Sequence, residues 1–276
     1  MTTVFIGGGN MATALIGGML ARGASVADLR VVEPLADARS RLAARHPGLA
    51  VFGECTREAV AGAALVTLAV KPQQMREAAR VLAPHLADGP VPVVLSIAAG
   101  IRLPDLSGWL LGHRRLVRAM PNTPALVGKG ISGVYALPDV DIAGRALVSK
   151  VLAAAGEIVW FDDESMLDAV TAVSGSGPAY VFFFVEALEE AARELGAAPA
   201  DARRLAYATF AGSMALAEAS PETPAVLRAQ VTSKGGTTER AIASLEADGV
   251  KAKIVAAVKA SALRARELGD VFGKDT

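Results

Sequence analysis

A glycine-rich segment near the N-terminus, GGGNMA at residues 7–12, places the strongest constraint on the fold. It stands between the β-branched run Thr2–Ile6 and a helical pattern that extends to about Arg22. This is the G-x-G-x-x-G/A pattern, which binds dinucleotides when it joins a strand to a helix. Gly7 permits the tight turn, Gly9 lets the backbone approach a pyrophosphate, and the free N–H groups of the helix start face the phosphates. The sequence therefore predicts a Rossmann-type domain.

Two further features near this segment bear on the same prediction. Ala12 and the pair Gly17–Gly18 are small, so we expect the first helix to pack closely on the sheet. A second strand, Leu29–Val32, ends at Glu33, about 20 residues after the glycines, where an acidic side chain bonds the ribose hydroxyls. The alternative for Glu33 is an ordinary exposed acid at a strand end.

Short apolar runs alternate with helical patterns through the rest of the first half, which is typical of a buried parallel sheet. The predicted strands are 65–69, 91–96, 116–120, 131–136 and 157–161, with a helix at 142–155. Ligands bind outside the carboxyl ends of parallel strands. Small or proline-containing turns follow the first three of these strands. Lys71 in one such turn either neutralises a phosphate or is simply solvated.

Only helical patterns follow after about Asp163. We predict helices over 179–195, over 201–219 with Asp201 as its cap, over 224–231, from the turn 233–238 to about 247, and over 251–268. The first of these is apolar all round at 180–185, so we infer burial in a subunit interface; burial against the first domain is the alternative. The predicted fold class is α/β, with an N-terminal Rossmann-type doubly wound sheet (1–162) and an all-α dimerisation domain (163–276).

Charge and composition exclude several kinds of partner. The 28 basic and 28 acidic side chains cancel, and no basic block stands out, so we expect neither nucleic acid nor a membrane surface as a partner. The most apolar run, 59–70, is too short to span a bilayer. No basic leader precedes the first strand, and the single cysteine, Cys55, fits a reducing compartment. We therefore expect a cytoplasmic protein.

The turn Ser233–Thr238 stands between two predicted helices and combines two glycines with hydroxyl side chains. This composition suits a pocket where N–H groups converge on an anion; an ordinary helix–helix connection is the alternative. Groups for acid–base, nucleophilic or metal catalysis are scarce. The three histidines all lie in the first half, and no Cys/His cluster has the spacing of metal ligands.

Hydride transfer to a protonated C=N bond fits this shortage, because the iminium already carries its proton. The enzyme then mainly positions the cofactor carbon and the imine carbon about 3–3.5 Å apart. A carboxylate on the substrate, held by the turn 233–238, provides a handle for that positioning.

Six segments, taken in order, resemble pyrroline-5-carboxylate reductase, the last enzyme of proline biosynthesis, over essentially the full length. They are Phe5–Met11, Ala69–Gln73, Ser96–Gly100, Arg118–Pro124, Val173–Tyr180 and Val231–Thr238. The resemblance implies reduction of 1-pyrroline-5-carboxylate to L-proline by hydride transfer from NADPH or NADH. It also implies that the helical domains of two subunits interlock, with dimers assembling further into decamers.

The resemblance also assigns site residues. The substrate carboxylate would be held by Ser233, Gly235, Gly236, Thr237 and Thr238, with Thr238 nearest the imine nitrogen and the candidate catalytic residue. Together with Glu33, the predicted cofactor residues are Ile6, Gly7, Gly8, Gly9, Asn10, Met11, Ala69, Val70, Lys71, Pro72, Ile97, Ala98 and Ala99.

The cofactor preference and two other functions remain open at this point. Glu33 should repel the 2′-phosphate of NADPH, so we expect comparable use of both cofactors or a preference for NADH, unless Arg39 or Arg41 offsets it. A carbonyl reductase of the β-hydroxyacid dehydrogenase type would carry a catalytic lysine on the long helix, and 179–195 contains none. A non-catalytic nucleotide-binding regulator would have a damaged substrate turn, whereas 233–238 looks intact.

Overall fold

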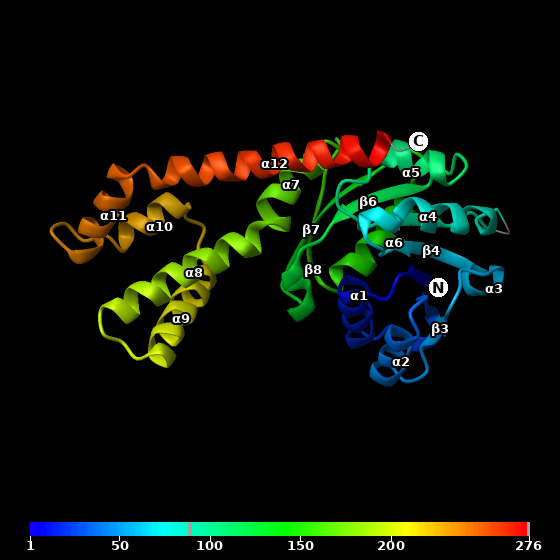
Figure 1. Ribbon diagram of the computed structural model, residues 1–276, viewed down its shortest axis with the longest axis horizontal. Helices are drawn as coiled ribbons and strands as arrows, with labels where there is room; N and C mark the ends of the chain where they lie inside the picture. The colour runs from blue at the N-terminus through cyan, green and yellow to red at the C-terminus, as the bar shows by residue number, and fades with distance from the viewer. Residues whose placement is uncertain (88–89, 275–276) are drawn as a thin grey trace. The chain divides into compact units, whose positions relative to one another are not determined.

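A single eight-stranded sheet organises the first part of the chain in the computed structural model, which describes residues 1–87 and 90–274 (Figure 1). Its strands are β1 (Thr2–Ile6), β2 (Leu29–Val32), β3 (Ala50–Phe52), β4 (Ala63–Leu68), β5 (Val93–Ser96), β6 (Leu116–Met120), β7 (Gly130–Ala136) and β8 (Gly156–Trp160). They lie side by side in the order β3-β2-β1-β4-β5-β6-β7-β8. All neighbours are parallel except β6 and β7.

Helices cover both faces of this sheet, which confirms the doubly wound prediction. The α-helices of this part are α1 (Asn10–Ala21), α2 (Ala36–Arg45), α3 (Arg57–Val60), α4 (Pro72–Leu82), α5 (Leu103–Trp109), α6 (Ile142–Ala153) and α7 (Met166–Val170). Short 3-10 helices occupy Val26–Asp28, Ala83–His85 and Thr123–Val127, and a π-helix, Thr171–Gly175, follows α7.

Two apolar cores result from the alternation of side chains along each strand. On β1, Phe5 belongs to the core that also contains buried residues of α1, α2 and α6. Its neighbours Val4 and Ile6 belong to the opposite core, which contains buried residues of α3, α4 and α5. All three β1 side chains are at most 5% exposed. The sheet is therefore a rigid platform whose strand ends have fixed relative positions.

The chain order reverses at β1, which pairs with β2 on one side and with β4 on the other. Ile6 is level with Val32 of β2 and with Leu68 of β4, and Leu68 is level with Ser96 of β5. The carboxyl ends of these strands therefore meet at one edge of the sheet. In open α/β sheets, that is where dinucleotides bind.

Some local predictions need correction. The strand β3 was not expected, because it has only three residues, one exposed and two partly buried, which carry almost no periodic pattern. Gly18 does not pack on the sheet: a side chain there would overlap with the Ala154 carbonyl oxygen just after α6. The helix predicted to be capped by Asp201 begins earlier, at Pro199, so Asp201 lies in its first turn and Ala198 is the N-cap.

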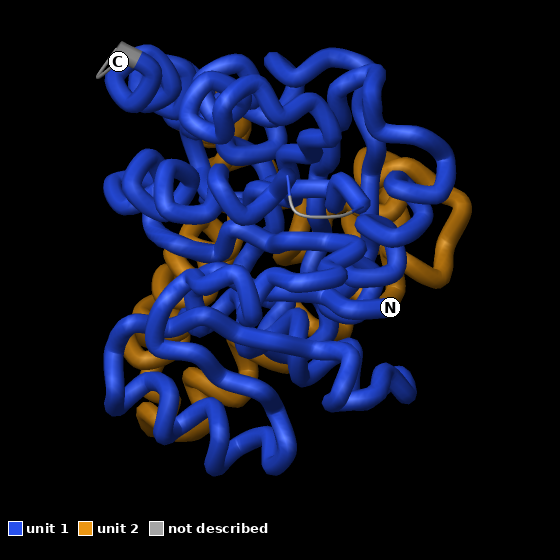
Figure 2. Tube along the Cα trace, turned by 90° about the vertical axis from the view of Figure 1, so that its right-hand side faces the viewer, with its two compact units in different colours: residues 1–176, 261–276 blue, residues 177–260 orange. Residues whose placement is uncertain are grey.

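The remaining helices are α8 (Gly177–Glu194), α9 (Pro199–Glu218), α10 (Pro224–Gln230), α11 (Thr237–Ala247) and α12 (Val250–Lys274). The chain forms two compact units, one comprising 1–176 with 261–276 and the other comprising 177–260 (Figure 2). The C-terminal turns of α12 thus belong to the unit that contains the sheet. The functional division at 162/163 stays a prediction. Within 1–87 and 90–274, no helix is both long and apolar enough to cross a membrane.

Candidate functional site

The glycine-rich loop after β1 has the backbone of a phosphate-binding turn. Gly7 has φ +98° and donates its N–H to the Val32 carbonyl at 2.8 Å. A Cβ at this position would lie 2.8 Å from the Ala69 carbonyl oxygen, so the loop passes close to β4. Gly9 is the N-cap of α1 and has no atom within 4 Å of its Cβ direction. The first N–H groups of α1 are thus available to an anion above Gly9, which fits a pyrophosphate.

Glu33 at the end of β2 is buried, with 8% of its surface exposed, rather than an ordinary exposed acid. Its Oε2 accepts the Gly8 N–H at 2.9 Å, and its Oε1 accepts the Leu35 N–H at 3.0 Å. Arg39 donates Nη1 to the carbonyls of Glu33 and Pro34 at 3.0 and 2.7 Å. The carboxylate therefore ties the phosphate loop to β2, and each oxygen keeps a further lone pair for a ribose hydroxyl.

The other predicted cofactor residues lie along the same strand ends. The Ala69 N–H donates to the Ile6 carbonyl at 2.8 Å, and the Ile97 N–H donates to the Leu68 carbonyl at 3.2 Å. Ala98 is buried and donates its N–H to Ser96 Oγ at 3.4 Å. The residues that the structure brings together at this edge are Ile6, Gly7, Gly8, Gly9, Asn10, Met11, Glu33, Ala69, Val70, Lys71, Pro72, Ile97, Ala98 and Ala99. Lys71 is exposed there, just before α4 begins.

The turn between α10 and α11 lies in the helical unit. Gly235 adopts φ +75°, which favours glycine, and Gly236 is the N-cap of α11 without a side-chain cap. The Gly236 N–H donates to the Ser233 carbonyl at 3.0 Å, so this N–H is used inside the turn. The N–H groups of Thr237 and Thr238 open the helix and have no intrahelical acceptor. The turn is therefore a helix start with two donors and several hydroxyls.

Glu239 is a residue of this turn that sequence reasoning missed. Its Oε2 accepts the Gly235 N–H at 2.7 Å, which stabilises the left-handed backbone before the helix. The available signal was a glutamate in the first turn of a helix, a position from which carboxylates bond free N–H groups. Of the backbone donors predicted for the turn, Gly235 and Gly236 are thus engaged internally.

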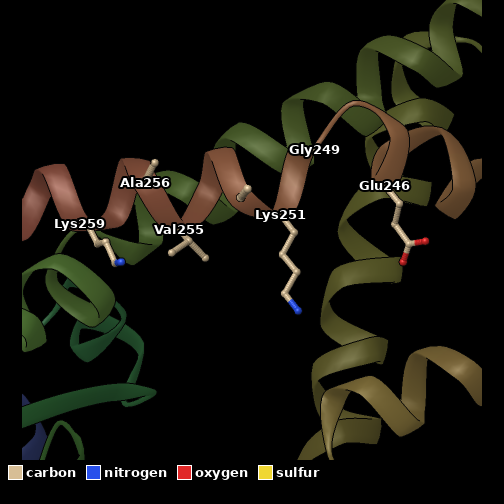
Figure 3. A pocket seen from close by; sticks show the side chains of 7 residues that line it. Glu246, Gly249, Lys251, Val255, Ala256 and Lys259 are labelled. Carbon is tan, nitrogen blue, oxygen red and sulfur yellow. The ribbon is translucent and has the colours of Figure 1, made fainter.

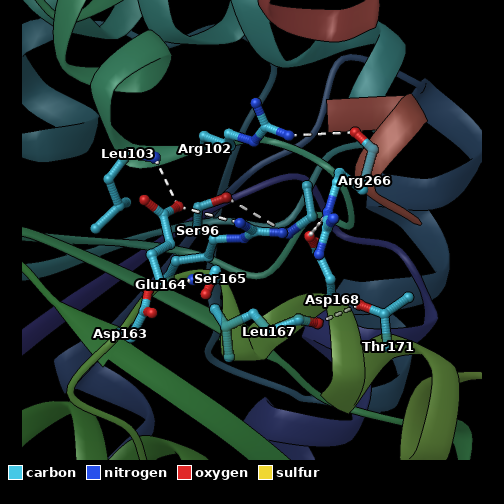
Figure 4. Close-up of polar contacts among 12 residues, drawn as sticks. Ser96, Arg102, Leu103, Asp163, Glu164, Ser165, Leu167, Asp168, Thr171 and Arg266 are labelled. Atoms are coloured by element: carbon cyan, nitrogen blue, oxygen red, sulfur yellow. Dashed lines mark hydrogen bonds and ion pairs between the residues drawn. The ribbon is translucent and has the colours of Figure 1, made fainter. Parts of the chain in front are cut away.

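An ion pair between a buried arginine and a partly buried glutamate connects β6 with the segment that leads into α7, and Glu164 is labelled in Figure 4. Arg118, 3% exposed, donates Nη1 to Glu164 Oε1 at 3.0 Å. The same oxygen accepts the Leu103 N–H at 2.9 Å and so caps α5. Arg102 in turn donates to the Arg266 carbonyl at 3.2 Å, which holds the last part of α12 to the sheet unit. Arg102 is also paired with Asp270 of α12 at 2.7 Å, so both arginines have a carboxylate partner and the contacts stabilise the sheet unit.

Burial shifts the pKa values of the cysteine and of two histidines toward their neutral forms. No three His, Cys, Asp or Glu side chains of residues 1–87 and 90–274 are grouped closely enough to hold a metal ion. Burial raises the pKa of the Cys55 thiol to about 11, so it stays protonated and unreactive at neutral pH. Burial also lowers the pKa values of His46 and His113.

Comparison with known proteins identifies the family. The chain is 44% identical to the pyrroline-5-carboxylate reductase of Pseudomonas aeruginosa over 270 residues, which covers 98% of this chain and 97% of the relative. The chain belongs to the pyrroline-5-carboxylate reductase family. A second member, from Haemophilus influenzae, is 37% identical and covers 97% of both chains.

Domain-level and structural comparisons agree with this family. The model for pyrroline-5-carboxylate reductase dimerisation matches residues 164–268, and that for the coenzyme F420-dependent NADP oxidoreductases matches 2–100. The reductase structure from Coxiella burnetii superimposes with a TM-score of 0.91 at 35% identity, covering 97% and 98% of the two chains. The Plasmodium falciparum enzyme, solved with NADP bound, gives 0.84 at 25% identity over 98% of each chain. The fold class and the family resemblance are confirmed.

Proposed function

We propose that this protein reduces 1-pyrroline-5-carboxylate to L-proline by hydride transfer from a nicotinamide cofactor, the last step of proline biosynthesis. The observation that carries the proposal is 44% identity to a pyrroline-5-carboxylate reductase over nearly the whole chain. The turn Ser233–Thr238 supports the proposal as well, because the N–H groups of Thr237 and Thr238 at the start of α11 have no intrahelical acceptor. Neither the carbonyl reductase nor the non-catalytic alternative has a comparable observation in its favour.

In this proposal the turn holds the substrate carboxylate. The N–H groups of Thr237 and Thr238 and the Ser233 hydroxyl donate hydrogen bonds to it, and charge assistance strengthens them. The Thr238 hydroxyl lies nearest the imine nitrogen and orients it. The iminium already carries its proton, so no residue has to supply one. The two glycines of the turn give its backbone the required shape. The residues that hold the carboxylate are therefore Ser233, Gly235, Gly236, Thr237 and Thr238.

A bound NADH or NADPH supplies the hydride. The free N–H groups of α1 bind its pyrophosphate, and Gly7 and Gly9 let the backbone come close to it. Glu33 accepts a ribose hydroxyl, and its negative charge disfavours a 2′-phosphate at the same place. We therefore expect comparable use of both cofactors or a preference for NADH. A preference for NADPH of more than about tenfold in kcat/KM would contradict this role of Glu33.

The helical unit forms a homodimer in this proposal, and dimers assemble further into decamers. Phe182 and Phe183 on α8 are each 68% exposed in the single chain, which is unfavourable for two large apolar side chains unless a partner covers them. A hollow of about 570 Å³ lies beside α12, and Lys251, Val255 and Lys259 project from the helix face that lines it (Figure 3). Light scattering tests the assembly, and a monomeric wild-type protein would contradict it.

A spectrophotometric assay with pyrroline-5-carboxylate and each cofactor tests the reaction itself. Oxidation of neither cofactor would refute the proposal. Thr238→Ala should lose most of its turnover or substrate affinity while binding the cofactor as before. Thr209→Ala is a matched control, since its hydroxyl donates only to the Leu205 carbonyl within α9. Unchanged kinetics in Thr238→Ala would remove this residue from the site.

A further inference from the structure

Asn122 joins two segments to which neither the sequence nor the proposed reaction assigns a role, 118–124 and 173–180. It follows β6, and only 8% of its surface is exposed. Its Nδ2 donates to the Ser174 carbonyl at 3.1 Å, and its Oδ1 accepts the Ile131 N–H at 2.9 Å. The amide orientation is fixed by these partners, because one offers only a donor and the other only an acceptor. Both ends of the side chain are therefore committed.

The Ser174 carbonyl belongs to the π-helix Thr171–Gly175. Its characteristic bond runs from the Ser176 N–H to the Thr171 carbonyl at 2.8 Å. Such turns are rare, are less favourable than α-helix, and occur frequently at functional sites. A Cβ on Gly175 would lie 2.6 Å from Met120 Cε, so the π-helix packs directly against the end of β6. Asn122 thus holds the π-helix in place at that strand end.

The contact between Asn122 and the π-helix lies at the end of β6, in the second half of the Rossmann sheet. A Rossmann sheet has two mononucleotide-binding halves, β1–β3 and β4–β6 in this chain order. Glu33 at the end of β2 identifies the first half as the place of the adenosine ribose. The nicotinamide therefore belongs over the ends of β4–β6, and β6 is parallel to β5 with Ser96 level with Arg118. The π-helix lies at the β6 end of this edge, where a nicotinamide ring would bind.

We propose that Asn122 is a positioning residue for hydride transfer. By holding the Ser174 carbonyl, it keeps the π-helix at the distance from the β6 end that the nicotinamide ring requires. The inference rests on the proposed function. Because the pyrophosphate and adenosine contacts lie on other strands, Asn122 governs the geometry of the reacting end and not the affinity for the cofactor.

Asn122→Asp is the most direct test. It retains the acceptor for the Ile131 N–H but turns an oxygen toward the Ser174 carbonyl, which repels the π-helix. We expect kcat to fall by about tenfold or more, since small misplacements of reacting groups have effects of this size. The dissociation constant of NADH should stay unchanged in a fluorescence titration. The primary isotope effect with 4-deuterated cofactor should rise, because hydride transfer becomes slower relative to product release.

Hydrogen exchange of the cofactor-free protein provides a readout that does not depend on turnover. In Asn122→Asp the amides of 171–176 should exchange faster, with little change at the β1 loop. Ser149→Ala is the matched control: it removes the hydrogen bond from Trp160 Nε1 at 3.1 Å, also in the sheet unit. That bond involves β8, which is separated from β6 by β7, and does not contact Asn122 or the π-helix, so kcat should not change.

Asn122→Ala is a second variant, for the case that Asn122→Asp does not fold. It removes the hydrogen bond to the Ser174 carbonyl without placing a charge beside it, and we expect the same loss in kcat with unchanged cofactor affinity. A wild-type kcat in either folded variant, or unchanged exchange at 171–176 in Asn122→Asp, would overturn the inference while the proposed function stands. A wild-type protein that oxidises neither cofactor would refute both.

Discussion

Substitution by alanine should have opposite effects on the free energy of unfolding at two neighbouring glycines of α1, Gly17 and Gly18. At Gly17 no atom lies within 4 Å of the direction that a Cβ would take. Gly17→Ala should therefore show the ordinary gain of helix propensity and raise the free energy of unfolding by about 1 kcal/mol. At Gly18 the new methyl group would overlap with the Ala154 carbonyl oxygen and lie 2.8 Å from its carbonyl carbon.

The magnitude at Gly18 follows from this contact. The overlap with the carbonyl oxygen is the larger of the two, so α1 and the backbone after α6 have to separate by more than about 1 Å to reach an ordinary contact distance. Overpacking costs about 1–3 kcal/mol, and we take the upper end because a carbonyl cannot rotate away like a side chain. After the propensity gain of about 1 kcal/mol, Gly18→Ala should be less stable than wild type by about 2 kcal/mol.

Thermal unfolding followed by circular dichroism measures the contrast. The two variants should differ by about 3 kcal/mol, or roughly 6–12 °C in Tm for a unit of this size. Each serves as the control of the other, because the change is the same and the positions are adjacent in α1. Equal stabilisation of both variants would contradict the close contact between Gly18 of α1 and the Ala154 carbonyl.

Three further predictions concern single side chains. Glu164→Ala should lower the free energy of unfolding by about 3–5 kcal/mol, because it leaves the buried guanidinium of Arg118 without its partner; urea denaturation checks this, and a loss below about 1 kcal/mol would mean that the pair is solvated. Since the pKa of Cys55 is raised to about 11, iodoacetamide should modify it at pH 8 about a hundredfold more slowly than a free thiol, and rapidly once the chain is unfolded. Burial lowers the pKa of His113 below 6.5, so the unfolded chain binds a proton at this side chain more readily than the folded chain does. The free energy of unfolding should therefore be unaffected by His113 above about pH 7 and should decline as the pH falls below that value. In His113→Gln this decline should be weaker, and an unchanged pH profile of Tm would exclude the contribution.

Much of the fold was predictable because local patterns and the fold agree. The loop 7–12 stands between a strand and a helix, and position 7 requires a φ of +98°, which only glycine adopts readily. Apolar runs located most strands to within one or two residues, since parallel strands are buried on both faces. The turn 233–238 could be recognised because its glycines and hydroxyls are consecutive in the chain. Motifs of this kind carry their geometry within a few residues.

Contacts between distant residues were decided by tertiary structure alone. Gly18 meets Ala154 and not the sheet, because the crossing of α1 with the end of α6 depends on how both helices pack. The same applies to the bond from Asn122 to Ser174, which joins two motifs that the sequence shows only as separate strings. The short strand β3 exists because β2 offers it a partner, not because of its own three residues. The sequence by itself thus determined the local turns and the family chemistry, whereas the packing of the assembled sheet unit decided which side chains hold them in place.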